Sequence, residues 1–113
     1  MKIEKVVVGF LRCNSYILSI NNKVLIIDPG DEGKKIDYLI GDREIVGIII
    51  THHHHDHDGA VDYFKDKYNT NVYDRFNLSE GINNIDIFKF EVIYTPGHTK
   101  EEITYYFKKE NII

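Results

Sequence analysis

The sequence has little of several features that would assign it to a common protein class. It contains one cysteine, Cys13, which excludes an internal disulfide and fits a reducing, cytoplasmic location. We interpret Cys13 as a small filler side chain rather than a ligand or a nucleophile. The longest apolar runs, VLII and GIII, are far too short to span a bilayer. The N-terminus, MKIEKVVVGFLRC, lacks the apolar core of a signal peptide.

Charge of one sign is not concentrated anywhere in the chain either. The net charge is -4 and the pI is about 5.8, with lysine and glutamate scattered along the sequence. This distribution argues against a nucleic-acid partner or an anionic membrane surface, and it leaves a small-molecule substrate as the expected partner. The length of 113 residues suits one modest core, and no linker or repeat divides it. We therefore treat residues 1–113 as a single domain.

Short β-branched runs alternate with two amphipathic stretches, which we expect to form helices over residues 34–40 and 59–68. Asn21 and Asn22 indicate a tight hairpin turn, because asparagine tolerates a positive φ. This order of elements predicts an α/β (α+β) fold with a mixed sheet and helices on one face. Strands are expected at 3–8, 15–20, 23–27, 46–50, 71–73, 85–88, 90–94 and 103–107.

What the chain does have is histidine gathered in one place. Five of its six histidines lie within residues 52–57, in the stretch THHHHDHDG, and the sixth is His98 in TPGHT. A purification tag would lie at a terminus, and a disordered metal-buffering tract would lack the apolar strand before it and the helix after it. Satisfied structural histidines are usually single. The clustering therefore indicates a metal site.

The spacing within the cluster suggests which of its side chains bind the ion. In an extended segment alternate side chains project the same way, so His52 and His54 can bind one ion. His53 and His55 then point elsewhere, and we do not assign them as ligands.

Further donors follow where the segment turns into the expected helix. Asp56 and His57 would come round beside the same ion, and a mixture of imidazole and carboxylate suits a borderline divalent metal such as Zn²⁺. Two imidazoles are too few for a catalytic site, which normally has three protein ligands and a water. His98 is the one other imidazole in the chain, and its Pro-Gly turn is suited to reaching a neighbouring strand end.

These motifs resemble those of the metallo-β-lactamase-fold hydrolases. THHHHDHDG matches the signature T-H-x-H-x-D-H-x-G, TPGHT resembles the turn that carries the next metal histidine, and NSYIL and VLIIDPG resemble the opening strands. The consecutive histidines are most similar to the hydroxyacylglutathione hydrolase (glyoxalase II) subgroup. The resemblance implies the N-terminal half of an αββα sandwich. It also implies a zinc-type hydrolase that uses a metal-bound hydroxide on a thioester or related small ester.

Residue by residue, the resemblance implies two metal positions. His52, His54 and His98 would hold the first ion, and Asp56 and His57 would belong to the second. Asp56 would ligate or orient the nucleophile rather than attack the substrate. Zinc is the expected metal, with iron or manganese as alternatives.

Two further residues have supporting roles in this interpretation. Asp28, in DPG, resembles a residue that lies near the metals in the family, although a simple role in the turn before the helix explains it equally well. Gly59 is expected to let the second helix pack close to the sheet.

The chain departs from the family pattern after TPGHT. Family members carry a later Gly-Asp whose aspartate bridges both metals, and then a last metal histidine. No aspartate or histidine follows His98 here, and Glu101 or Glu102 as a substitute is less expected than a solvent-facing role. The first site therefore has its full set of protein ligands and the second only part of one.

Three accounts of this departure stay open. The chain lacks the C-terminal half of a longer domain, or a homodimer or complementing chain supplies that half, or the chain is a non-catalytic metal-binding half-domain. A di-iron redox protein of the same fold is the alternative function. Metal content distinguishes these hypotheses, since hydrolysis predicts two zinc ions, redox chemistry two irons, and the metal-binding half-domain one loosely held ion.

Overall fold

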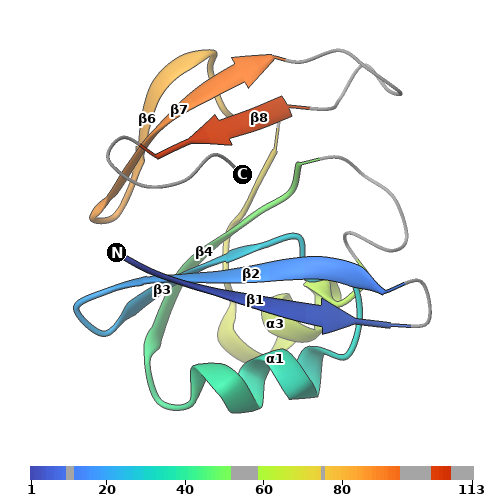
Figure 1. Ribbon diagram of the computed structural model, residues 1–113. Coiled ribbons are helices and arrows are strands. Elements are labelled where there is room, and N and C mark those ends of the chain that lie inside the picture. Colours follow the sequence, from blue (N-terminus) through green and yellow to red (C-terminus); the bar gives the residue numbers. More distant parts are fainter. Residues whose placement is uncertain (10–11, 52–58, 75, 95–102, 108–113) are drawn as a thin grey trace.

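The computed structural model describes residues 1–9, 12–51, 59–74, 76–94 and 103–107. In this part of the chain, a five-stranded sheet lies between a layer of two helices and a second, three-stranded sheet (Figure 1). Neither helix of the described residues has the length and apolarity that a bilayer crossing requires. The arrangement confirms the predicted mixed sheet with helices on one face.

The five-stranded sheet has the strand order β1-β2-β3-β4-β5. Its first three strands pair antiparallel, whereas β3–β4 and β4–β5 pair parallel. A parallel pair needs a crossover connection, and here helix α1 connects β3 to β4 and helix α3 connects β4 to β5. The carboxyl ends of β3, β4 and β5 therefore lie at one edge of the sheet. The bounds are β1 Lys2–Val8, β2 Cys13–Ile20, β3 Lys23–Ile27, α1 Gly33–Ile40, β4 Glu44–Ile49, α3 Val61–Tyr68 and β5 Val72–Tyr73.

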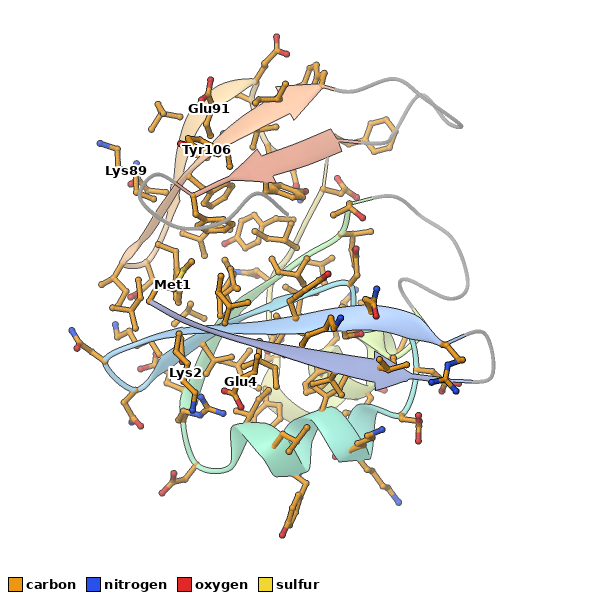
Figure 2. All side chains as sticks on the ribbon, viewed as in Figure 1. Met1, Lys2, Glu4, Lys89, Glu91 and Tyr106 are labelled. Carbon is orange, nitrogen blue, oxygen red and sulfur yellow. The ribbon has the colours of Figure 1, made fainter. Side chains whose placement is uncertain are left out.

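The three-stranded sheet is antiparallel throughout, with the order β6-β7-β8. Side chains alternate along its central strand, so Phe88, Phe90 and Val92 are buried against the first sheet. Figure 2 shows Lys89 and Glu91 of the same strand pointing away from the first sheet. The bounds are β6 Gly81–Ile85, β7 Phe88–Tyr94 and β8 Ile103–Tyr106.

The apolar runs of the sequence form the middle of the molecule. Strand β3 has helices on one face and the second sheet on the other, which is why nearly all of its residues are apolar. Val24 and Ile26 pack in the helix-side cluster together with Phe64 of α3. Leu25 and Ile27 pack in the cluster between the sheets. One strand thus contributes to both cores.

The structure confirms the predicted hairpin and corrects the strand assignment around residue 85. Asn21 and Asn22 both have positive φ, at 53° and 77°, as a two-residue primed turn requires. The strand expected at 85–88 is wrong, because Asp86 and Ile87 form the turn between β6 and β7. Strand β6 was missed because its sequence, GINNI, contains a glycine and two asparagines, which are depleted in strands.

The close helix contact occurs at a different glycine from the one expected. Gly59 is exposed and precedes α3, which begins at Val61, so it lies outside the helix that it was expected to bring close to the sheet. Helices α1 and α3 approach each other closely at Gly33, the first residue of α1. A Cβ there would lie 2.7 Å from Cγ of Tyr63 in α3. A side chain at Gly33 would separate the two helices.

Candidate metal centre

The predicted metal ligands lie on two segments of the chain. His52, His54, Asp56 and His57 follow β4, whereas His98 lies between β7 and β8. All five residues lie outside the described part of the chain, so their assignment stays a prediction. Within the described residues, no three His, Cys, Asp or Glu side chains gather as a metal site would need. The structure instead defines the strand ends on either side of both segments.

Asp28 holds the residue that directly precedes the histidines. It follows β3, is buried, and has a left-handed backbone with φ 50°. Its Oδ1 accepts a hydrogen bond from the Thr51 N–H at 2.8 Å, and its Oδ2 accepts one from the Thr51 hydroxyl at 2.6 Å. Its own N–H donates to the Ile49 carbonyl at 2.9 Å. One aspartate therefore both turns the chain and fixes the start of the histidine segment.

A buried serine on β2, Ser15, contacts the backbone carbonyl of this aspartate. The Ser15 hydroxyl donates to the Asp28 carbonyl at 2.5 Å, and the Gly30 N–H donates back to the same hydroxyl oxygen at 3.3 Å. Ser15 has no exposed surface. The DPG turn is thus anchored to a neighbouring strand, which limits how far Asp28 can move.

Ile50, the residue after β4, is bonded on both sides. Its N–H donates to the Tyr73 carbonyl at the end of β5, at 2.9 Å. Its carbonyl accepts a hydrogen bond from the Tyr105 hydroxyl of β8, at 2.8 Å. The approach to the histidine segment is therefore held by β3, β5 and the second sheet together.

Tyr105 is fully buried and acts as a neutral donor. Burial raises the pKa of its hydroxyl far above the ordinary value, and the nearby negative charges of Asp28 and Asp74 raise it further. Its ring packs edge-on against Phe90, with the ring centroids 5.8 Å apart. Because the phenolate form is strongly disfavoured, the hydroxyl stays protonated and can donate to the Ile50 carbonyl.

Sequence reasoning identified Asp28 and did not identify Ser15 or Tyr105 as parts of this arrangement. The alternation of TYYF along a strand predicts that Tyr105 faces inward, since alternate residues share a face. The same pattern does not predict which carbonyl the Tyr105 hydroxyl would reach. That contact joins residues of two different sheets, which are far apart in the sequence. For Ser15, in NSYIL, the same alternation predicts only that its side chain faces inward.

The family model of the metallo-beta-lactamase superfamily matches residues 8–75, which span strands β2 to β5 and the histidine motif. The chain belongs to this superfamily. It is 29% identical over 145 residues to the probable metallo-hydrolase YqgX of Bacillus subtilis, an alignment covering 100% of this chain and 69% of that protein. It is 36% identical over 99 residues to hydroxyacylglutathione hydrolase of Chromohalobacter salexigens. That second alignment covers 76% of this chain and 38% of the relative.

Solved structures of the superfamily share the fold. BLEG-1 B3 metallo-beta-lactamase superposes with a TM-score of 0.88 at 24% identity, covering 96% of this chain and 68% of that one. TTHA1623, in a di-iron-bound form, superposes with a TM-score of 0.79 at 25% identity, covering 91% of this chain and 66% of that one. The chain thus corresponds to about two thirds of these structures and to 38% of the hydroxyacylglutathione hydrolase. The predicted superfamily and fold class are confirmed.

Proposed function

We propose that the protein is a metal-dependent hydrolase that cleaves a thioester or a related small ester. The observation that carries this proposal is the motif THHHHDHDG, placed directly after a strand end that Asp28 holds, within the part of the chain that matches the superfamily. Relatives named metallo-hydrolase and hydroxyacylglutathione hydrolase support the reaction class.

The donor set fits a divalent metal. His52, His54 and His98 offer three imidazoles for a first ion, and Asp56 and His57 offer a carboxylate and an imidazole towards a second. Imidazole with carboxylate is the chemistry that Zn²⁺ accepts readily and that iron and manganese also accept. When bound, the metal would supply Lewis acidity, which makes water nucleophilic near neutral pH and polarises a scissile carbonyl.

The chain's own residues supply orientation. Asp56 would orient the attacking water, because a carboxylate beside the reaction centre can accept its hydrogen bond. Asp28 and Tyr105 restrict the backbone from which the histidine segment departs, so the donors need less ordering when a ligand arrives. A thiolate leaves without prior protonation, so a thioester would not require a general acid.

Two adjacent histidines provide the test of this proposal. His54→Ala should remove metal-dependent turnover of a hydroxyacylglutathione thioester, because it deletes a ligand. His53→Ala should keep most of that turnover, because the alternation of side chains predicts that His53 is not a ligand. The release of free thiol measures both. Equal losses in the two variants would contradict the alternating assignment, and full activity in both would contradict the proposed site.

A solved neighbour in a di-iron-bound form supports iron as the metal in one alternative, a di-iron redox protein of the same fold. Elemental analysis together with the thiol-release assay distinguishes the two: zinc with thioester turnover supports the hydrolase, and two irons per chain without thioester turnover support the redox protein. A homodimer or a complementing chain that completes the second site is part of the same proposal. Native mass spectrometry would detect it as a species of twice the chain mass or as a mixed complex.

A further inference from the structure

Tyr105 connects the strands that flank the two predicted ligand segments. It lies on β8, the strand that follows the segment containing His98. Its hydroxyl donates to the carbonyl of Ile50, which precedes Thr51 and the histidine motif. Among the described residues, this bond joins the second sheet directly to the end of β4.

We propose that Tyr105 is a positioning residue that sets the β7–β8 hairpin against the end of β4. This contact would fix the position of the connection that contains His98 relative to the end of β4, which leads into His52 and His54. This inference rests on the proposed metal site. It adds a specific role for a residue that binds neither metal nor substrate.

The hydroxyl, rather than the ring, provides this registration. The inner face near the end of the hairpin carries two aromatic residues, Tyr105 and Phe107, and both pack against Phe90. Apolar contacts of this kind tolerate small shifts, because hydrophobic packing is non-directional. A hydrogen bond to a buried carbonyl is directional and costly to leave unmade. Of the two inner side chains, Tyr105 makes the directional bond that reaches the end of β4, whereas another directional contact between the sheets, Lys23 to Asp86, lies at the opposite end of β3.

The strand pairing transmits this position to the segment that contains His98. Tyr105 pairs with Val92, and Ile103 pairs with Tyr94. The described residues on either side of segment 95–102, Tyr94 and Ile103, are therefore paired with each other. Fixing Tyr105 fixes both ends of that segment relative to Ile50.

The test compares two tyrosine-to-phenylalanine variants in the full chain. Tyr105→Phe deletes the hydroxyl and keeps the ring. Tyr63→Phe is the matched control, because the Tyr63 hydroxyl also makes a buried-partner hydrogen bond, to Oδ2 of Asp37 at 2.8 Å, but in the helix layer. Zinc affinity is measured by competition with a chromophoric chelator, and stability is measured by urea unfolding of the metal-free protein.

We expect Tyr105→Phe to weaken zinc binding by about tenfold or more, the range found when groups that support metal ligands are removed. Tyr63→Phe should lower stability and leave the zinc affinity within about twofold of wild type, because it leaves the strand ends intact. An unchanged zinc affinity in Tyr105→Phe, or equal weakening in both variants, would overturn the inference.

His98→Ala separates this inference from the proposed function. Wild type that binds no zinc, or that binds it equally well after His98→Ala, would contradict the proposed site itself. Wild type that binds zinc through His98, with Tyr105→Phe unaffected, would contradict only the positioning role. If Tyr105→Phe does not fold, Phe90→Leu replaces it. That variant loosens the ring while keeping the hydroxyl, so it should leave the zinc affinity within about twofold of wild type. A tenfold weakening in folded Phe90→Leu would show that ring packing sets the position and would overturn the inference.

Discussion

At the scale of single residues, Asp28 combines two roles that are usually separate. Its backbone adopts a left-handed conformation, which aspartate and asparagine tolerate better than most residues. Its carboxylate accepts two hydrogen bonds from Thr51. A replacement for Asp28 must therefore adopt a left-handed backbone and also accept hydrogen bonds from Thr51.

We predict that Asp28→Ala lowers the free energy of unfolding by about 2 kcal/mol or more, because it strains the left-handed position and removes both acceptors. Asp28→Asn should cost less, since asparagine tolerates the same φ and keeps one carbonyl acceptor. Urea unfolding of both variants measures the difference. An alanine variant as stable as the asparagine variant would show that the carboxylate hydrogen bonds contribute little.

At the scale of secondary-structure elements, the two helices are joined by one buried carboxylate. Asp37 of α1 accepts hydrogen bonds from the Lys67 ammonium at 2.6 Å and from the Tyr63 and Tyr68 hydroxyls at 2.8 and 2.5 Å. The ammonium also lies over both tyrosine rings. Burial alone would raise the pKa of Asp37, but the hydrogen bonds from Lys67, Tyr68 and Tyr63 outweigh it and lower that pKa.

This lowered pKa predicts an acid-sensitive helix contact. The contribution of Asp37 is fully present above its unfolded pKa of about 3.9 and is lost as the pH falls through the lower folded value. The stability difference between wild type and Asp37→Asn should therefore be constant at neutral pH and shrink below about pH 4. Lys67→Met should flatten the same acid limb. Urea unfolding midpoints from pH 2 to pH 7 measure the pH dependence of stability in wild type and both variants. Parallel midpoint profiles in all three proteins would contradict the prediction.

The β2–β3 hairpin turn gives a second prediction at this scale. Asn22 has φ 77°, so Asn22→Ala should lower the free energy of unfolding by about 1 kcal/mol through left-handed strain. Asn22→Gly should preserve or raise the stability, because glycine is the preferred residue there. Thermal unfolding compares the two. A glycine variant less stable than the alanine variant would show that the Asn22 side chain matters more than its backbone.

Sequence patterns predicted the elements better than the contacts between them. The apolar runs VLII and GIII predict buried strands, and the two asparagines predict a turn with positive φ. Both signals lie within a few consecutive residues, so they can be found in the sequence. Strand β6 could not be found this way, since its position depends on pairing with β7 rather than on its own composition. The Tyr105–Ile50 bond was equally hidden, because it joins residues far apart in the chain. The metal ligands were inferred from spacing and resemblance, and they stay predictions.

At the scale of the whole molecule, the two sheets pack closely where β4 has no side chain. Gly47 is buried between them, and a Cβ there would lie 3.0 Å from Cε2 of Tyr73, 3.2 Å from Cγ2 of Ile85 and 3.3 Å from Cδ1 of Leu25. These contacts come from both sheets. The separation of the sheets is therefore matched to a glycine at this point.

We predict that Gly47→Ala lowers the free energy of unfolding by about 1–3 kcal/mol, because the added methyl group overpacks against Tyr73, Ile85 and Leu25, which must shift to accommodate it. Ile82→Ala, on the outer face of the second sheet where Ile82 is 61% exposed, is the control and should change stability by less than about 0.5 kcal/mol. Urea unfolding measures both variants. A Gly47→Ala protein of wild-type stability would mean that the sheets adjust without cost.

The bonded end of β4 also has a consequence for isotope exchange. The Ile50 amide donates to the Tyr73 carbonyl and the Thr51 amide to the Asp28 carboxylate, so neither proton is available to solvent while these bonds last. Both protons should exchange with deuterium only when this part of the sheet opens. Their exchange rates would report how often the backbone ahead of His52 opens, one residue at a time and without any ligand present.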